Sequence, residues 1–321
     1  MSNKVKKRVE HMRNNKYNNI YGMMTISKIE KRNKKVRIML SVALLILAII
    51  LIAIILCISD NIKKQKQAKA YETQILQYKQ QEEEKEKQKA EEEERKRKEK
   101  LPQITEQGKQ NFETIYHSET KRVFLTFDDG PSTVTPTILQ TLSEKGVKAT
   151  FFMLGTNVEK MPDTVKQVYE QGHYIANHGY SHVYSSIYAN PQSVLDEYNK
   201  ANEVIQNALG EPEFNSHLFR FPGGYVGGKY ADIKKEAKEL LNQNDILNVD
   251  WNCLTGDAEI REPTSEYIMR RLQETSSGKN SLIILMHDAQ AKKVTAEMLP
   301  QVIDYLAEQG YEFKTFYDIF E

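Results

Sequence analysis

Short apolar runs alternate with amphipathic segments along the chain from residue 121 onward. The apolar runs predict buried strands, because each spans only a few residues and is bounded by turn-forming residues. These runs cover residues 123–127, 149–153, 174–176, 218–220, 245–249, 282–285 and 312–314. Between them, apolar positions at helical spacing predict helices over residues 136–144, 164–171, 191–209, 230–242, 264–276 and 295–308. Such alternation favours parallel strands joined by right-handed crossovers, either as a barrel or as an open doubly wound sheet.

The first third of the chain follows a different pattern. Residues 38–59 are 22 consecutive residues without a charged side chain. As a helix they would be about 33 Å long, enough to cross the apolar core of a bilayer. A buried core helix is one alternative, but soluble helices seldom stay apolar on every face over such a length. A cleaved signal peptide is another, but the long charged segment before the run and the lack of an A-x-A pattern argue against it. The pattern therefore predicts a retained signal anchor and one transmembrane helix.

The distribution of charge indicates how this anchor is oriented. The net charge is only +1, but residues 1–37 carry 12 lysines and arginines against 2 acidic residues. Positively charged flanks stay in the cytoplasm. We therefore expect a basic cytoplasmic tail over residues 1–37 and a single-pass protein of the cell membrane whose remaining residues are extracellular.

Residues 60–120 are predicted to form an extracellular stalk and linker. Within them, residues 61–100 carry 13 basic and 10 acidic side chains, with few apolar positions. Blocks of opposite charge at helical spacing favour a solvated, partly helical segment. Too few apolar positions recur for a sustained coiled-coil seam.

Composition excludes several other classes of protein. Residues 101–321 hold 20 basic and 31 acidic side chains, and an acidic domain lacks the basic face that nucleic-acid binding needs. The two cysteines, Cys57 and Cys253, are too few for a disulfide scaffold or a CxxC-type zinc site. No glycine-rich nucleotide-binding motif follows a predicted strand.

Chemically active side chains occur where the predicted strands end. They are Asp128 and Asp129 after the first strand, His178 and His182 after the third, Arg220 at the end of the fourth, Asp250 after the fifth and His287 after the sixth. Because the carboxyl ends of parallel strands share one face of a β/α barrel, we expect these side chains to converge. His178 and His182 are also spaced to lie on one side of a helical turn, where both could bind one metal ion. A turn, a surface ion pair or a satisfied core histidine explains each feature alone, but not the whole set.

These motifs, in this order, resemble those of the polysaccharide deacetylases of carbohydrate esterase family 4, the NodB-homology domain, over residues 121–317. The matching motifs are Thr126-Phe127-Asp128-Asp129-Gly130-Pro131-Ser132, His178-Gly179-Tyr180-Ser181-His182, Arg220-Phe221-Pro222-Gly223, Asp250-Trp251 and Leu285-Met286-His287. Many members have tyrosine where this chain has Gly223, so this chain retains the backbone N–H at that position but lacks the tyrosine side chain. The stretch Asp250-Trp251-Asn252 with Gly256-Asp257-Ala258 resembles the bacterial peptidoglycan-directed members. The resemblance implies a distorted (β/α) barrel of about seven parallel strands.

The resemblance also implies a metal site and a general base. Asp129, His178 and His182 would hold a divalent metal ion, for which we expect Zn²⁺, with Co²⁺, Mn²⁺ and Ni²⁺ as alternatives. Two imidazoles and one carboxylate leave an open position at the metal, as hydrolytic sites require. Asp128 would be the general base, and Arg220 would keep it ionised and oriented.

The remaining motif residues are assigned to the leaving group and the acyl group by the same resemblance. His287 would be the general acid, oriented by Asp250. The backbone N–H of Gly223 would stabilise the oxyanion. Trp251 and Leu285 would form the floor of the acetyl pocket.

We therefore expect a membrane-anchored, metal-dependent hydrolase that removes N-acetyl groups from cell-wall polysaccharide, with peptidoglycan N-acetylglucosamine as its substrate. A chitooligosaccharide deacetylase or an O-acetyl polysaccharide esterase is an alternative, because ester and amide hydrolysis use the same residues. A non-catalytic glycan-binding ectodomain is a third interpretation, which the presence of every motif residue opposes. Beyond the glycan and the membrane, no nucleic-acid or protein partner is predicted.

Overall fold

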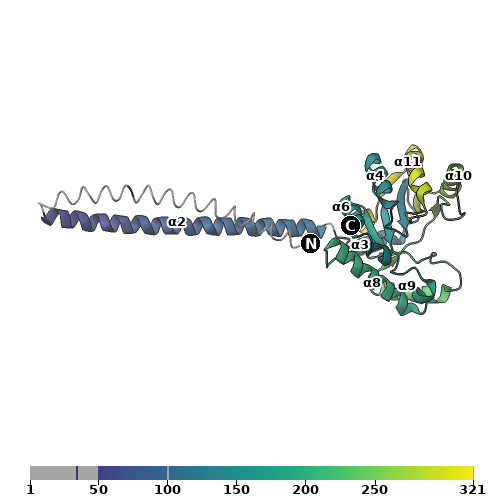
Figure 1. Cartoon of the computed structure of the whole chain (residues 1–321), viewed down its shortest axis with the longest axis horizontal. Coiled ribbons are helices and arrows are strands. Elements are labelled where there is room, and N and C mark those ends of the chain that lie inside the picture. Colours follow the sequence, from purple (N-terminus) through teal and green to yellow (C-terminus); the bar gives the residue numbers. More distant parts are fainter. Residues whose placement is uncertain (1–33, 35–49, 100, 321) are drawn as a thin grey trace. The chain divides into compact units, whose positions relative to one another are not determined.

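Figure 1 shows the computed structural model, which describes residue 34 and residues 50–99 and 101–320. The chain divides into two units, Met1–Glu92 and Glu93–Glu321. Residues 38–49 of the predicted anchor lie outside the described residues, and the rest of it belongs to helix α2 (Ile50–Glu99). None of the described helices is long and apolar enough to cross a membrane.

Helix α2 is charged along most of its length, and its side chains between residues 61 and 92 are nearly all exposed. Oppositely charged residues recur at helical spacing, as in the pair between Lys87 and Glu91 (3.7 Å), and such pairs support a solvated helix. In the second unit, Arg97 near the end of α2 forms an ion pair with Glu211 in the loop after helix α8 (Pro191–Leu209). This pair holds the last turns of α2 within that unit.

The second unit is built around one sheet in which every strand pair is parallel. Its strands are β1 (Arg122–Asp128), β2 (Thr150–Met153), β3 (Tyr174–Asn177), β4 (Leu218–Phe219), β5 (Leu247–Asn248), β6 (Cys253–Leu254), β7 (Ser281–His287) and β8 (Glu312–Lys314). Seven strands follow the order β5-β4-β3-β2-β1-β7-β6, and β8 pairs with the first three residues of β1. The prediction of about seven parallel strands is confirmed. The end strands β5 and β6 are not paired with each other, so the described sheet is an open half-barrel.

Six helices on the outer side of the sheet correspond to the six predicted ones. They are α4 (Thr135–Lys145), α6 (Pro162–Glu170), α8, α9 (Ala231–Asn242), α10 (Ser265–Ser276) and α11 (Lys293–Glu308). Neighbouring helices pack in the order α9, α8, α6, α4, α11, α10, which follows the strand order. In Figure 1, α8 and α9 lie at one end of this row, and α10 and α11 lie at the other. The pattern did not predict the short helices α3 (Glu106–Glu113), α5 (Gly155–Val158), α7 (Tyr184–Ile187) and α12 (Tyr317–Phe320).

The ends of α8 illustrate why these helices form where they do. The side chain of Asn190 caps the first turn by accepting a hydrogen bond from the backbone N–H of Ser193 (3.0 Å), and Pro191 occupies the first helical position. Gly210 ends the helix with φ 71°, a left-handed conformation that glycine adopts without strain.

Alternation along β1 separates two cores. Val123 and Leu125 pack under the outer helices, whereas Phe124 faces the concave side of the sheet. At the start of the strands, the concave core is closed by Phe316 and Phe320 next to and within α12, with α3 packed against them. At the carboxyl ends of the strands, polar residues line the concave face.

The register between β1 and β7 positions the predicted base and acid. Asp128 is paired with His287, and Thr126 is paired with Leu285. Since side chains two residues apart lie on one face of a strand, Thr126 and Asp128 continue the concave face that begins with Phe124. The predicted catalytic pair therefore lies on adjacent strands, above an apolar core.

Candidate active site

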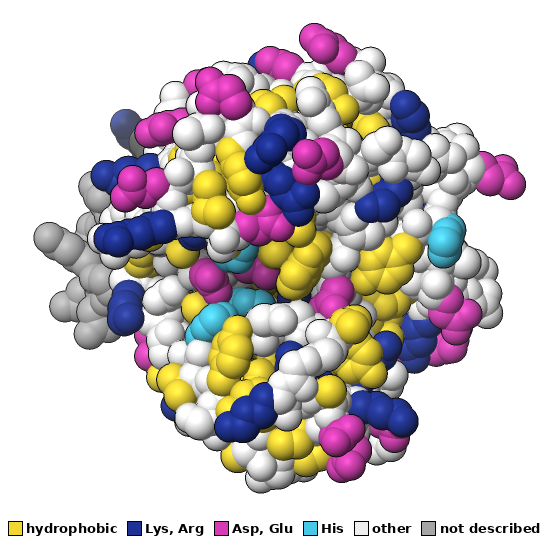
Figure 2. Space-filling view, turned by 90° about the vertical axis from the view of Figure 1, so that its right-hand side faces the viewer, with side chains coloured by type: hydrophobic (Ala, Val, Ile, Leu, Met, Phe, Trp, Pro, Cys, Tyr) yellow, Lys and Arg dark blue, Asp and Glu magenta, His cyan; other side chains and the backbone are white. Residues whose placement is uncertain are grey.

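The carboxyl ends of the strands surround a hollow in the surface of the second unit. Figure 2 shows histidine and acidic side chains gathered in this hollow, with hydrophobic side chains around it. The structure brings together Asp128, Asp129, His178, His182 and Arg220 there, as the short distances between their polar atoms show. This convergence is what the positions of the residues at strand ends predicted.

Asp128 is buried at the end of β1, and its Oδ1 accepts a hydrogen bond from Nη1 of Arg220 at 2.7 Å. Arg220 is fully buried, and the same Nη1 donates to Oγ1 of Thr126 at 2.7 Å. Burial raises the pKa of Asp128, while the guanidinium of Arg220 opposes this rise. Arg220 thus fixes the orientation of the carboxylate and leaves Oδ2, 3.8 Å from Nε2 of His178, to act as a base.

Asp129, His178 and His182 form the candidate metal site. Their ligand atoms lie within 4.8 Å of one another, and no other group of this kind occurs in the described part of the chain. Oδ1 of Asp129 is 3.6 Å from Nε2 of His178 and 3.4 Å from Nε2 of His182. Ligand atoms about 2.1 Å from a tetrahedral Zn²⁺ are separated by about 3.4 Å, so these distances suit one shared ion.

The polar groups around this site fit a cation. Oδ1 of Asp129 is buried and has no hydrogen-bond partner among the described residues, which is unfavourable for a carboxylate oxygen unless a cation compensates it. Nδ1 of His178 lies 2.8 Å from the backbone carbonyl of Arg220. This contact assigns the proton to Nδ1 and leaves the lone pair of Nε2 directed toward the site. Burial lowers the pKa of His178 to about 3, so the ring is in the neutral form that binds metals.

The backbone at two of these ligands is unusual. Asp129 has φ 72° and His182 has φ 56°, values that non-glycine residues seldom adopt and that recur at functional sites. Glu197 on α8 holds the turn that carries the histidines, accepting the backbone N–H groups of Tyr180 and Ser181 at 2.7 Å each. The sequence analysis missed Glu197, because one glutamate on an amphipathic helix carries no distinguishing pattern.

The implied pairing of His287 with Asp250 is wrong, since the partner of His287 is Asp257. Nδ1 of His287 lies 3.0 Å from Oδ1 of Asp257, and Oδ2 of Asp257 accepts the backbone N–H of His287 at 2.8 Å. Asp257 follows β6, the strand next to β7. Asp250 instead follows β5, at the other edge of the sheet, and its carboxylate accepts the backbone N–H of Tyr225 at 2.9 and 3.0 Å. Asp257 was noted in the sequence as part of Gly256-Asp257-Ala258, but no role was assigned to it there.

Asp257 also determines the charge state of His287. Burial alone would lower the pKa of His287, but the hydrogen bond and charge of Asp257, with the charges of Asp128 and Asp129, raise it to about 9. The imidazole is therefore protonated at neutral pH and can donate its proton to a leaving group. Asp257 is itself almost fully buried, and Oγ1 of Thr295 donates to its Oδ2 at 2.8 Å.

Gly223 offers an unused backbone donor. The hydroxyl of the buried Tyr188 donates to the carbonyl oxygen of Pro222 at 2.7 Å. Because the C=O and N–H of a trans peptide point in opposite directions, the N–H of Gly223 is directed away from Tyr188. Within the described residues this N–H has no acceptor, and Gly223 is exposed. Its assignment as an oxyanion donor stays a prediction that this geometry supports.

The two residues predicted for the acetyl pocket differ in position. Leu285 precedes His287 by two residues on the concave face of β7 and is half-buried. The ring of Trp251 lies 5.7 Å from the guanidinium carbon of Arg220, against Gly224. Trp251 also lines a neighbouring cavity, so its role in the acetyl pocket stays a prediction.

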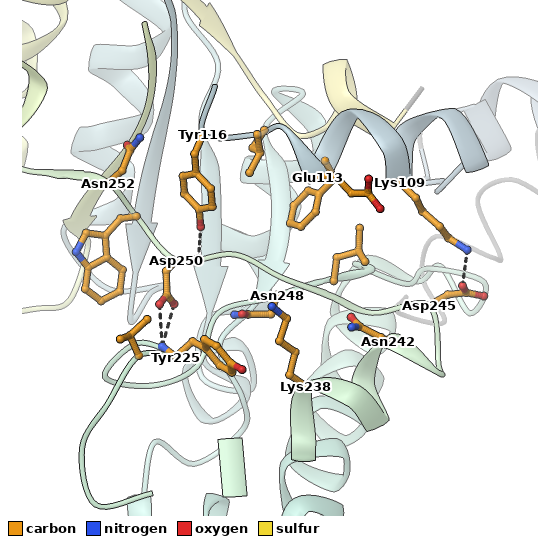
Figure 3. Close-up of a pocket in the computed structure, with 15 residues that line it drawn as sticks. Lys109, Glu113, Tyr116, Tyr225, Lys238, Asn242, Asp245, Asn248, Asp250 and Asn252 are labelled. Carbon is orange, nitrogen blue, oxygen red and sulfur yellow. Dashed lines mark hydrogen bonds and ion pairs between the residues drawn. The ribbon is translucent and has the colours of Figure 1, made fainter. Parts of the chain in front are cut away.

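That cavity has a volume of about 720 Å³ and lies where β5 and β6 are unpaired, between α3 and the end of α9 (Figure 3). We call it the seam groove. Its walls include the aromatic side chains of Phe112, Tyr116, Tyr225 and Trp251. It adjoins the catalytic residues, because the backbone N–H of Asp250 donates to the hydroxyl of Tyr116 (3.0 Å) while its carbonyl accepts from Arg220 (3.2 Å).

Together these groups are the ones that metal-assisted hydrolysis of an acyl group requires. Residues 116–242 match the family model described as polysaccharide deacetylase. The chain is 34% identical over 209 residues to the putative polysaccharide deacetylase YheN of Bacillus subtilis, covering 64% of this chain and 70% of that protein. It is 32% identical over 205 residues to a peptidoglycan-N-acetylglucosamine deacetylase of Bacillus cereus, covering 62% and 71%.

The chain also resembles a solved structure of the same enzyme class. The structure of a Streptococcus mutans CE4 esterase superposes with a TM-score of 0.60 at 30% identity, covering 66% of this chain and 92% of that one. The chain therefore belongs to the polysaccharide deacetylase family, carbohydrate esterase family 4, and the predicted family and enzyme class are confirmed.

Proposed function

We propose that this enzyme removes acetyl groups from N-acetylglucosamine residues of peptidoglycan. The observation that carries the proposal is the pairing of β1 with β7, which brings the Asp128–Arg220 pair opposite the His287–Asp257 pair. Amide hydrolysis needs both groups, a base to activate water and an acid to protonate the departing amine. The Bacillus cereus relative, whose name includes this activity, supports peptidoglycan as the substrate.

In the proposed mechanism, Asp128 removes a proton from the attacking water through Oδ2, while Arg220 holds Oδ1. The N–H of Gly223 donates to the carbonyl oxygen as negative charge develops on it. His287 then gives its proton to the amine nitrogen as the C–N bond breaks. Asp257 keeps the ring oriented through Nδ1 and favours the imidazolium until that step.

Asp129, His178 and His182 would hold a divalent metal ion, for which Zn²⁺ fits the combination of two imidazoles and one carboxylate. When bound, the ion supplies Lewis-acid polarisation and lowers the pKa of water. The buried, unpartnered Oδ1 of Asp129 and the neutral ring of His178 support this assignment. Co²⁺, Mn²⁺ and Ni²⁺ are alternatives that the same ligands accept.

The seam groove supports a polymeric substrate. Its aromatic walls offer flat surfaces for the apolar faces of sugar rings, and Asn242 and Asn248 add amide groups that can hydrogen-bond to hydroxyls. At about 720 Å³ it exceeds what one acetamido group needs. We infer that sugars flanking the reacting residue bind there.

The proposed cellular arrangement rests on the sequence. A signal anchor over residues 38–59 would hold the enzyme in the cell membrane with residues 1–37 in the cytoplasm. Residues 60–120 would serve as stalk and linker, and the catalytic domain over residues 121–317 would be extracellular. Protease added to intact cells should then release the catalytic domain, and its complete protection would contradict this orientation.

Mass spectrometry of peptidoglycan fragments tests the proposed reaction. Incubation with the metal-loaded protein should remove one acetyl group per N-acetylglucosamine residue, and Asp128→Asn protein should leave the fragments unchanged. Chitooligosaccharides and O-acetylated polysaccharide, assayed in parallel, distinguish the two alternative activities. Release of acetate only from O-acetylated substrate would refute the proposal, as would binding of fragments without any turnover.

A further inference from the structure

Tyr184 lies beside the candidate metal site but belongs to none of the motifs. It follows His182 by two residues at the start of α7, and the two rings are 5.5 Å apart. Tyr184 is 41% exposed, and the described residues provide no hydrogen-bond partner for its hydroxyl. A phenol hydroxyl that is open in this position is available to donate to a substrate.

The hydroxyl of Tyr184 lies directly against Gly223. A Cβ atom added to Gly223 would overlap with Oη of Tyr184 and lie 3.1 Å from its Cζ. Tyr184 therefore occupies the space that a side chain at position 223 would take. Gly223 has φ 75°, a conformation that suits glycine. The phenol has this room only because residue 223 is a glycine, so the two positions are coupled.

This contact places two donors side by side. The N–H of Gly223, which has no acceptor among the described residues, is one covalent bond away from the Cα atom that the hydroxyl of Tyr184 approaches. The ring of Tyr184 packs beside His182, a half-buried member of the candidate metal site. The carbonyl of an acyl group bound at this metal site would therefore meet both donors.

We propose that the hydroxyl of Tyr184 is a second oxyanion donor, acting with the N–H of Gly223 on the carbonyl oxygen of the scissile acetyl group. The inference rests on the proposed function, because that function places the acyl group of the substrate in this hollow. As the water oxygen bonds to the carbonyl carbon, the electron pair of C=O moves to the oxygen. Tyr184 keeps its proton, and its hydrogen bond strengthens. A donor that acts on developing charge stabilises the transition state more than the bound substrate, so its removal lowers kcat.

The test is Tyr184→Phe, which removes only the hydroxyl, assayed on 4-nitrophenyl acetate and on a peptidoglycan fragment. Loss of one oxyanion donor typically costs about 10²-fold in kcat, so we expect a loss of that order on both substrates with little change in KM. Metal content and melting temperature should match the wild type. Tyr267→Phe is the matched control, because its hydroxyl bonds to Glu259 on the surface (2.8 Å), and it should retain full activity.

Wild-type kcat in Tyr184→Phe on the ester would overturn the proposal, as would a loss confined to KM or one that parallels loss of metal. The two substrates separate this inference from the proposed function. Wild-type enzyme that hydrolyses the ester but leaves the peptidoglycan fragment intact contradicts the proposed substrate. The ratio of variant to wild type on the ester still decides the role of Tyr184.

Discussion

Asp257→Asn should lower the pKa of His287 and move the alkaline limit of deacetylation to lower pH. The buried carboxylate of Asp257 is the main reason that the pKa of His287 lies at about 9 and not at its ordinary 6.5. A change of that size corresponds to about 3 kcal/mol of preference for the imidazolium. Since the acid is active only when protonated, activity is present below its pKa and lost above it.

The size of the effect follows from the protonated fraction. At pH 8, an imidazole with a pKa near 9 is about 90% protonated, whereas one with a pKa of 6.5 is about 3% protonated. For these two pKa values, Asp257→Asn would lose about 30-fold in kcat/KM at pH 8, and the loss should shrink as the pH falls toward the pKa of the variant. A dication bound at Asp129 lowers the pKa of His287 in both proteins, so their difference still reports on Asp257.

Two measurements check this reasoning. The pH dependence of kcat/KM on an N-acetylated oligosaccharide gives the alkaline limb, and NMR titration of the His287 ring in the metal-free protein gives its pKa directly. Asp250→Asn is the control, because the carboxylate of Asp250 is held by the backbone N–H of Tyr225 and not by His287. A shift of the alkaline limb in Asp250→Asn but not in Asp257→Asn would refute the assignment.

Three further predictions follow from the site. His178→Ala should lose metal and activity together, whereas Asp128→Asn should keep the metal and lose turnover, as elemental analysis and rate assays on the same samples would reveal; retention of metal in His178→Ala would contradict the ligand assignment. Glu197→Ala removes the acceptor that holds the histidine turn, so metal affinity by competition with a chelator should fall about 10–100-fold; unchanged affinity would make Glu197 a surface residue. Tyr225→Ala removes an aromatic wall of the seam groove worth about 1 kcal/mol, so kcat/KM should fall about fivefold on long glycans and stay unchanged on a disaccharide; equal losses would place the effect in the catalytic site.

The sequence was sufficient to predict the long helices and strands and most of the chemical groups of the candidate active site. Strands β1 and β7 are seven residues each and contain the apolar runs Val123–Leu125 and Leu282–Met286, so their pattern is clear. Strand β6 is only Cys253–Leu254, too short for periodicity to register, and its role as the neighbour of β7 depends on tertiary packing. The convergence of the polar residues was predictable because parallel strands share the direction of their carboxyl ends.

The partnerships within the site were less predictable than its members. Asp250 and Asp257 are both aspartates after short strands, and the choice between them depends on which strand adjoins β7, a fact that no local pattern contains. Glu197 and Tyr184 act across contacts between α8, α7 and the loops that carry the motifs. Residues of this kind become visible only when the distances between segments are known.

The pairing of β1 with β7 and β8 also has a consequence for the order of folding. Paired residues of β1 and β7 are 159 positions apart, and β8, which completes the edge of β1, follows later still. During synthesis, β1 can pair early with β2, but its partners β7 and β8 exist only when nearly the whole domain has been made, and such non-local pairing folds slowly. If the chain crosses the membrane as proposed, this delay would keep the domain unfolded while it is translocated. Base and acid would then meet for the first time outside the cell, so that no active deacetylase forms on the cytoplasmic side.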